Sequence, residues 1–452
     1  MCKRLCSVGL DVGTTTTQLV VSELTVENRA SGFAVPELDI TERKIRYCSD
    51  VYVTPLSGHD RVDGAAIREI LEREYDRAGL RPADVDTGAV IITGETSRKE
   101  NAREVLAALA DIAGDFVVAT AGPHLESVLA AKGSGAVAYS EKTGKRVLHM
   151  DIGGGTSNLA LIENGKILRT GCLNVGGRLI KTEDGRITYL SPVLKELTDL
   201  QPGQILTEEG AAEVAALLNQ GLEMAAGLRQ RDALWEKLVT QEAPGTVPVE
   251  PGAVLSFSGG VAECIEKNLP DDAFGDIGPA LGRAIRKSRL CGGEYMLGEQ
   301  TIRATVIGAG CHSAQLSGST VFCRGTALPV KNLPAVVLDG TEQTDAAAIR
   351  RKLAEQENTA ILAMPGIPSP SYGQVRQLAD AVLEGVGDRP VYVCLESDMA
   401  KALGTCLCLQ LPEDRPCLCI DGVKLTEEAF LDVGTPVGPA FPVVVKTLIL
   451  SQ

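Results

Sequence analysis

A chain of 452 residues is too long for one ordinary core and predicts two or three domains. Apolar residues make up 44% and charged residues 23%, which is ordinary for a globular protein, and the net charge of −15 argues against nucleic acid as a main partner. No apolar run approaches the roughly 18 residues of a membrane helix. Because Asp11 interrupts the first apolar stretch too early for a signal peptide, we expect a cytoplasmic protein with no membrane segment.

The N-terminal part alternates strands and helices. Residues 1–54 are expected to form three strands with turns. The predicted elements that follow are a helix over Asp63–Ala78, a strand over Gly88–Thr93, a helix over Arg98–Ala110, a strand over Phe116–Ala119 and a helix from Pro123. Such alternation predicts a doubly wound α/β layer, assigned here to a first half over residues 1–140.

The same short phrase occurs twice, about 140 positions apart. The first copy is Asp11–Val20 and the second is Asp151–Ala160. Without gaps, Asp11 aligns with Asp151, and Gly13, Thr16 and Leu19 align in the same way with their counterparts. Each copy follows one apolar run and leads into another, which predicts a strand, a tight turn and a strand. Two such hairpins from two related halves can clamp a polyphosphate and its metal ion.

The residue types in these turns fit phosphate. Glycines let the backbone approach a ligand closely, and successive N–H groups in a turn form an anion-binding nest. Carboxylates would repel phosphate, so Asp11 and Asp151 are predicted to act on it through a hard cation. The predicted phosphate-binding residues are Gly13, Thr14, Thr15, Thr16, Gly153, Gly154, Gly155 and Thr156.

The second half, residues 141–324, carries an adenosine-binding phrase. After helices over Glu208–Leu217 and Leu222–Leu238 and a linker over Gln241–Gly252, an apolar strand runs into Ser258, Gly259 and Gly260. A Gly-Gly step after a strand allows a flat ring such as adenine to lie against the backbone. A strand over Arg303–Ile307 and a helix after Gly310 are expected to close this half, with Gly308 and Gly310 beside the nucleotide.

From residue 325 to 452 the pattern indicates a separate small α/β unit. Its predicted strands are Ala335–Leu338, Thr359–Ala363, Pro390–Cys394 and Pro416–Ile420, and its predicted helices are Asp345–Gln356 and Tyr372–Glu384. The pairs Cys406/Cys408 and Cys417/Cys419 would each put both sulfurs on one face of a strand. Their apolar flanks favour buried core thiols over a four-thiolate metal or cluster site.

In their order, these phrases resemble the actin-like ATPase superfamily: first phosphate loop, connecting helix, second phosphate loop, adenosine loop, second connecting helix. In their individual residues, several stretches of the chain are similar to the family of ethanolamine ammonia-lyase reactivating factors. The similar stretches are Leu10–Thr17, Ile92–Ala102, Ala121–Ser127, His149–Thr156 and Pro442–Leu450. They run through nearly the whole chain.

The resemblance implies an α/β, actin-like ATPase fold of two related halves with a nucleotide cleft, plus the small C-terminal unit. It implies ATP and Mg²⁺ as ligands, with Asp11 and Asp151 on the metal side. Glu126, near the start of the connecting helix, is the predicted water-positioning residue. The implied partner is ethanolamine ammonia-lyase, an adenosylcobalamin enzyme from which such factors release damaged cobalamin.

Three functions stay open on the residues alone. They are an ATP-driven factor acting on a protein client, with weak Mg²⁺-dependent ATPase activity, a small-molecule kinase on the same fold, and a non-catalytic actin-like scaffold. An activator with an iron–sulfur cluster at the cysteine pairs is a variant of the first. A homo-oligomer and an association with a bacterial microcompartment are also open, and the DxHxxG phrase of cobalamin-binding domains is absent.

Overall fold

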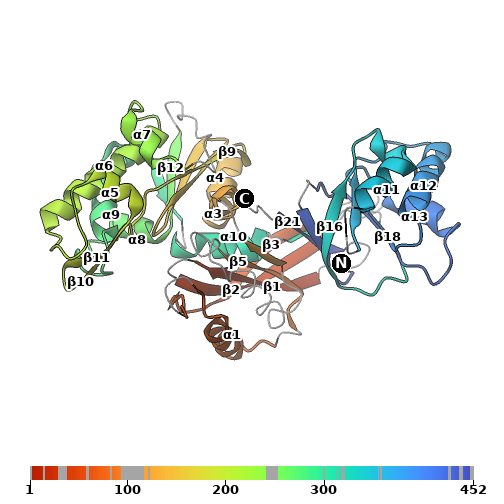
Figure 1. Ribbon diagram of the computed structural model, residues 1–452, viewed down its shortest axis with the longest axis horizontal. Helices are drawn as coiled ribbons and strands as arrows, with labels where there is room; N and C mark the ends of the chain where they lie inside the picture. Colours follow the sequence, from red (N-terminus) through yellow and green to blue (C-terminus); the bar gives the residue numbers. More distant parts are fainter. Residues whose placement is uncertain are drawn as a thin grey trace.

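The computed structural model describes most of the chain. It covers residues 3–13, 16–28, 38–57, 61–81, 84–92, 117–120, 123–240, 253–298, 301–312, 314–316, 321–354, 356, 359–425, 429–436 and 441–447. In Figure 1 the first sheet lies in the centre, with the second half on one side and the C-terminal unit on the other.

The first sheet is mixed and begins with the predicted hairpin. Its strands are β1 (Lys3–Val12), β2 (Thr16–Asn28), β3 (Leu38–Cys48), β4 (Tyr52–Val53), β5 (Thr87–Ile92) and β6 (Val117–Thr120). Their order is β3-β2-β1-β5-β6, with β4 paired to β2. β1, β2 and β3 are antiparallel neighbours, whereas β5 and β6 run parallel to β1.

The second sheet repeats this topology strand for strand. Its strands are β7 (Val147–Ile152), β8 (Ser157–Glu163), β9 (Lys166–Leu173), β12 (Val254–Ser258) and β13 (Tyr295–Leu297). Their order is β9-β8-β7-β12-β13, with the antiparallel part formed by β7, β8 and β9 and the parallel part by β7, β12 and β13. The two related halves predicted from the repeated phrase are therefore confirmed.

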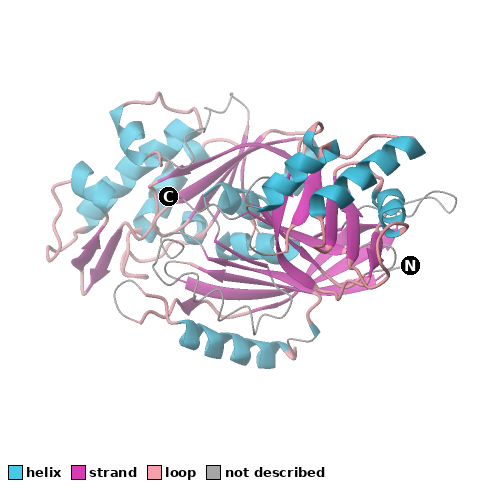
Figure 2. Ribbon diagram, turned by 45° about the vertical axis from the view of Figure 1, so that its right-hand side comes forward, coloured by secondary structure: helices cyan, strands magenta, loops and turns pink. Residues whose placement is uncertain are grey.

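Each half covers the outer face of its own sheet. α1 (Gly64–Ala78) packs on the first sheet, and Figure 2 shows it along the lower side. The Asp63 side chain caps its start, and Gly79, with φ of 68°, ends it in the left-handed region that glycine favours. The second sheet is covered by α5 (Pro192–Leu197), α6 (Glu208–Ala225), α7 (Ala233–Leu238), α8 (Gly260–Glu266) and α9 (Gly278–Lys287), beside the hairpin of β10 (Ile180–Glu183) and β11 (Arg186–Leu190).

The inner faces are covered by exchanged helices. α3 (Pro123–Gly133) follows the first sheet in the chain but packs on β7, β8 and β9, with α4 (Ala136–Thr143) beside it. α10 (Ala304–His312) follows the second sheet but packs on β1, β2 and β5.

The two exchanged helices also touch each other at glycines. A Cβ on Gly133 would lie 1.8 Å from the Ala304 oxygen, and one on Gly308 would lie 2.1 Å from the Leu129 oxygen. Only glycine fits at these two points, so the crossing of α3 and α10 ties the two halves together.

The C-terminal unit is a third sheet with helices on one face. Its strands are β14 (Ala314–Leu316), β15 (Phe322–Arg324), β16 (Val330–Val337), β17 (Ile361–Met364), β18 (Val391–Leu395), β19 (Cys417–Asp421), β20 (Ala429–Val433) and β21 (Pro442–Thr447), in the order β14-β21-β20-β16-β17-β18-β19-β15. The four strands β16 to β19 are parallel and sequential. Because the crossovers between these strands all run in one direction along the sheet and share one hand, α11 (Ala346–Ala354), α12 (Tyr372–Val386) and α13 (Ala400–Cys408) are expected on one face, and they pack in one core cluster.

Several predictions of local structure were wrong, including the helix over Leu222–Leu238, which is interrupted between Ala225 and Ala233, and the helix after Gly310, because α10 already ends at His312. Arg303–Ile307 is helical, because it packs its small residues against α3 rather than pairing in a sheet. The predicted break between Leu217 and Leu222 is absent. α6 continues to Ala225 because Gly221, without a Cβ, makes room for Leu238. Cys406 and Cys408 lie on helix α13, not on a strand, whereas Cys417 and Cys419 share one face of β19.

Some predictions lie outside the described residues. These are Thr14, Thr15, the helix over Arg98–Ala110 and the linker over Gln241–Gly252. The domain boundaries after residues 140 and 324 stay predictions. In the structure β14 and β15, which precede the second boundary, pair with strands of the third sheet.

Candidate functional site

The two hairpins close with the same geometry. The N–H of Gly13 donates to the Thr16 oxygen at 2.9 Å, and the N–H of Gly153 donates to the Thr156 oxygen at 2.9 Å. In the first hairpin, the Thr54 hydroxyl donates to the Gly13 oxygen at 2.8 Å. This bond anchors the turn to the residue that follows β4. The gapless alignment of the two phrases therefore corresponds to a shared closing hydrogen bond.

The second turn presents donors to solvent. Gly153 and Gly154 are half-buried, and Gly155 is exposed. Within the residues that the structure describes, the N–H groups of Gly154, Gly155 and Thr156 donate no hydrogen bond to the protein. Three successive free donors in one turn form the kind of concavity that binds an anion.

The carbonyl side of the same turn is held by a neighbouring segment. The N–H of Gly177 donates to the Gly153 oxygen at 3.0 Å, and the N–H of Arg178 donates to the Gly154 oxygen at 2.7 Å. A Cβ on Gly176 would lie 2.3 Å from the Gly154 oxygen. This brace uses the carbonyls of the turn and leaves its N–H groups uninvolved.

An acid and an amide stand opposite each other in each hairpin. Asp11 pairs across the strands with Gln18, and Asp151 pairs with Asn158, so each pair shares one face of its sheet. Asp11 is half-buried and Asp151 is buried. The faces are those covered by α10 and α3, so both acids lie at the inner side of their half.

The two amides hold the starts of the exchanged helices. The Gln18 Nε2 donates to the Ile302 oxygen at 3.2 Å, just before α10, and the Asn158 Nδ2 donates to the Glu126 Oε2 at 2.7 Å in α3. The amide oxygens, Gln18 Oε1 and Asn158 Oδ1, are buried and accept no hydrogen bond within the described part of the chain. Such oxygens retain acceptor capacity for a ligand or a water.

The adenosine phrase lies directly against the second hairpin. The N–H of Gly259 donates to the Thr301 oxygen at 2.8 Å, and its φ of 86° is in the left-handed region. A Cβ there would lie 2.3 Å from the Ile152 oxygen. Gly260 begins α8 with open space at its Cβ position, so only Gly259 requires glycine for its contacts.

Ser258 joins the adenosine phrase to Asp151. Its hydroxyl donates to the Asp151 Oδ1 at 2.5 Å and lies 2.9 Å from the Nε2 of His149. Burial raises the pKa of Asp151 to about 6, against the opposing effect of hydrogen bonds from Ser258 and Thr305. Burial also lowers the pKa of His149 to about 3, so its ring is neutral at physiological pH.

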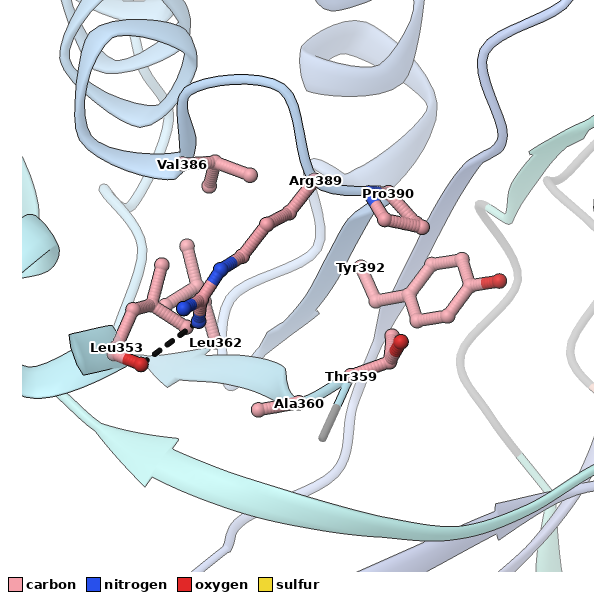
Figure 3. Close-up of a pocket in the computed structure, with 8 residues that line it drawn as sticks. All are labelled: Leu353, Thr359, Ala360, Leu362, Val386, Arg389, Pro390 and Tyr392. Atoms are coloured by element: carbon pink, nitrogen blue, oxygen red, sulfur yellow. Dashed lines mark hydrogen bonds between the residues drawn. The ribbon is translucent and has the colours of Figure 1, made fainter. Parts of the chain in front are cut away.

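The predicted residues Gly308 and Gly310 lie within α10. Gly308 is at the helix crossing, and its assignment to the nucleotide stays a prediction, as does that of Gly310. Elsewhere, a small pocket in the C-terminal unit is lined by Leu353, Thr359, Ala360, Leu362, Val386, Arg389, Pro390 and Tyr392 (Figure 3). It has room for about one water and lies at the amino ends of β17 and β18, away from the strand ends that usually bind ligands.

Sequence reasoning missed Gln18, Asn158, Thr305 and the brace at Gly176 to Arg178. The two amides could have been found, because they occupy the same place in the aligned phrases, seven residues after each aspartate. Thr305 and the brace come from segments far away in the chain, and no local pattern marks them.

The duplicated topology and the two acid-bearing hairpins place the protein in the class of actin-like ATPase folds. A family model described as "Ethanolamine utilisation protein EutA" matches residues 3–451. Two proteins named ethanolamine ammonia-lyase reactivase EutA, from Salmonella typhimurium and Escherichia coli, are similar to this chain. Each is 39% identical to it, and the similarity covers 99% of this chain and 98% of the relative. The chain belongs to the EutA family.

The similarity of the chain to solved structures is more distant. An Aquifex aeolicus member of the Ppx/GppA family is 14% identical, covers 68% of this chain and 97% of its own, and has a TM-score of 0.41. Among the described residues, no helix is long and apolar enough to cross a membrane.

Proposed function

We propose that this protein is an ATP-dependent reactivating factor for ethanolamine ammonia-lyase, which releases damaged cobalamin so that intact adenosylcobalamin can bind. Membership of the EutA family and the 39% identity to two proteins named as reactivases of that enzyme support the client. The observation that supports the nucleotide is the pair of matched hairpins, each with an acid opposite a buried amide.

The phosphates are assigned to the two turns. The N–H groups of Gly154, Gly155 and Thr156, which donate to no described part of the protein, can donate to phosphate oxygens. The first turn has the same closing bond at Gly13, so the two turns would hold one polyphosphate from opposite sides. This local field of donors is needed because the whole protein carries a net charge of −15 and would otherwise repel a nucleotide.

Mg²⁺ is the proposed companion of the nucleotide, and the residues fit a hydrated cation. No group of three His, Cys, Asp or Glu side chains in the described ranges is arranged to hold a metal directly. Asp11 and Asp151 would therefore bind it largely through waters, and the open acceptors Gln18 Oε1 and Asn158 Oδ1 could hold such waters. When bound, the cation would neutralise charge on the phosphates that the two carboxylates otherwise repel.

Glu126 is the proposed water-positioning residue for hydrolysis. Its carboxylate is buried and accepts from the Asn158 Nδ2 at 2.7 Å, which fixes one oxygen beside the second hairpin. The Glu126 carboxylate would then orient a water toward the phosphates. Because Glu126 lies on α3, its position also depends on the crossing with α10.

The exchanged helices offer a path from the nucleotide to the rest of the molecule. Thr305 on α10 contacts Asp151 of the second half, while α10 packs on the first sheet. β14 follows α10 closely in the chain and belongs to the third sheet. We propose that the nucleotide state acts on the C-terminal unit through this connection.

A reactivation assay tests the proposed function. Ethanolamine ammonia-lyase inactivated with a cobalamin that cannot react is mixed with this protein, ATP, Mg²⁺ and free adenosylcobalamin, and ethanolamine turnover is measured. Turnover should return with the full mixture and stay absent when ATP or Mg²⁺ is omitted. Equal recovery without the protein would refute the proposal.

The same preparation separates the alternatives. A small-molecule kinase would show ATP turnover that depends on an acceptor such as a sugar or carboxylate, and a scaffold would polymerise with nucleotide. The proposed factor instead has weak basal ATPase activity and binds its client. We place the protein in the cytoplasm. Its association with a bacterial microcompartment can be tested by cell fractionation, and its self-association by sedimentation.

A further inference from the structure

A buried chain of hydrogen bonds between β7 and β12 ends at Asp151. His149 and Asp151 lie two residues apart on β7, and on the parallel neighbour β12 their partners in register are Ser256 and Ser258. All four side chains face the same side of the sheet, and all but Asp151 are fully buried. The His149 Nδ1 lies 3.0 Å from the Ser256 hydroxyl, and its Nε2 lies 2.9 Å from the Ser258 hydroxyl.

The chemistry of these groups fixes the direction of the chain. The ionised Asp151 carboxylate can only accept, so the single hydrogen of Ser258 must point to it across the 2.5 Å contact. The Ser258 oxygen is then left to accept from His149, which requires the tautomer with hydrogen on Nε2. His149 Nδ1 in turn accepts from Ser256, since the second hydroxyl near it, that of Ser134, donates to the Ala131 oxygen.

This arrangement does something that packing alone does not need. If His149 carried its hydrogen on Nδ1, its bare Nε2 would compete with the Asp151 carboxylate for the single hydrogen of Ser258. With its hydrogen on Nε2, the histidine donates to the Ser258 oxygen and leaves the serine hydrogen to Asp151, and the serine in turn orients one carboxylate oxygen. Resting on the proposed function, we propose that His149 is a positioning residue, which acts through Ser258 to hold Asp151 in the orientation that binds hydrated Mg²⁺ with the nucleotide.

The test measures the Mg²⁺ concentration needed for half-maximal binding of a fluorescent ATP analogue. Loss of a partner that orients a metal ligand typically costs 10- to 100-fold in metal affinity. Ser258→Ala should therefore raise the Mg²⁺ requirement by roughly 10-fold or more. His149→Asn should behave like Ser258→Ala, because the shorter amide places no N–H at the Nε2 position. His149→Gln places an N–H near that position and should stay close to the wild type.

A double-mutant cycle tests whether the histidine acts through the serine. In the Ser258→Ala background, His149→Asn should add little to the Mg²⁺ requirement, because its path to Asp151 is already cut. The matched control is Ser140→Ala, which removes another fully buried serine, bonded to the Lys145 oxygen at 2.8 Å, and should leave the Mg²⁺ requirement unchanged.

The possible outcomes distinguish failure of the positioning role of His149 from failure of the proposed function. Equal Mg²⁺ requirements in the wild type, Ser258→Ala and His149→Asn would overturn the positioning role while leaving nucleotide binding intact. An additive double mutant would also overturn it, since the histidine would then act by another route. A wild-type protein that binds no nucleotide with Mg²⁺ would overturn both proposals.

Discussion

Replacing Asp151 by asparagine should make the nucleotide-free protein more stable. Burial raises the pKa of Asp151 from its ordinary value of 3.8 to about 6. Ionisation is therefore harder in the folded state than in the unfolded state, and the charge destabilises the fold. The difference corresponds to about 3 kcal/mol at pH 7.5, where both states are ionised. Asparagine has nearly the same shape and still accepts from Ser258, so it removes this cost without leaving a cavity.

The stability gained by Asp151→Asn depends on pH. The cost is absent below the unfolded pKa, grows as pH rises from about 4, and is complete above about 6. At roughly 2.1 cal/mol/K per residue, 3 kcal/mol corresponds to a rise in Tm of about 3 °C for a chain of 452 residues that unfolds as one unit. The gain should fall to about half near pH 5.

Thermal unfolding of the wild type and Asp151→Asn at pH 5 and 7.5, with and without nucleotide and Mg²⁺, measures both effects. Ligand should raise the Tm of the wild type but hardly that of the variant, because binding stabilises only a protein that binds. The exposed Asp388→Asn is the matched control and should change neither quantity. A lower Tm for Asp151→Asn at pH 7.5, or a gain that is the same at both pH values, would refute the reasoning.

Three further predictions concern separate parts of the molecule. Glu126→Gln should keep nucleotide affinity and slow hydrolysis by roughly 10²–10⁴-fold, measured by phosphate release, because the water loses its positioned acid–base group; unchanged hydrolysis would make Glu126 an ordinary buried carboxylate. Gly259→Ala should lower stability by roughly 1–3 kcal/mol and weaken nucleotide binding, since its Cβ would strike the Ile152 oxygen, while Gly260→Ala should be tolerated; equal effects of the two changes would count against the close contact. Elemental analysis after purification without added metal should find no stoichiometric zinc or iron at Cys406, Cys408, Cys417 and Cys419, and stoichiometric iron would instead favour a cluster.

The sequence predicted the parts of the fold that local pattern controls. Continuous apolar runs identified β1, β7 and the parallel strands β17 to β19, and the repeated Asp-x-Gly phrase identified both hairpins and hence the duplication. It failed where tertiary contact decides. The stretch Arg303–Ile307 is apolar enough for a strand, yet its glycine neighbour and small residues serve the crossing with α3.

The candidate site shows the same division. Asp11, Asp151 and the turn glycines are found from the repeat alone. The partners of Asp151 are not, because Ser258 arrives from a parallel strand about a hundred residues later and Thr305 from a helix that crosses between the halves. His149 could be seen in the sequence, but its role depends on the register of β7 with β12, which pairs it with Ser256.

Equilibrium titration with ATP in the presence of Mg²⁺ tests the central claim most directly, namely that one nucleotide is held jointly by both hairpins. The wild type should bind one nucleotide per chain. Asp11→Asn and Asp151→Asn should each weaken that binding strongly, although the two residues lie in different halves. Undiminished binding in both variants, or two independent sites of which each variant loses one, would contradict the account.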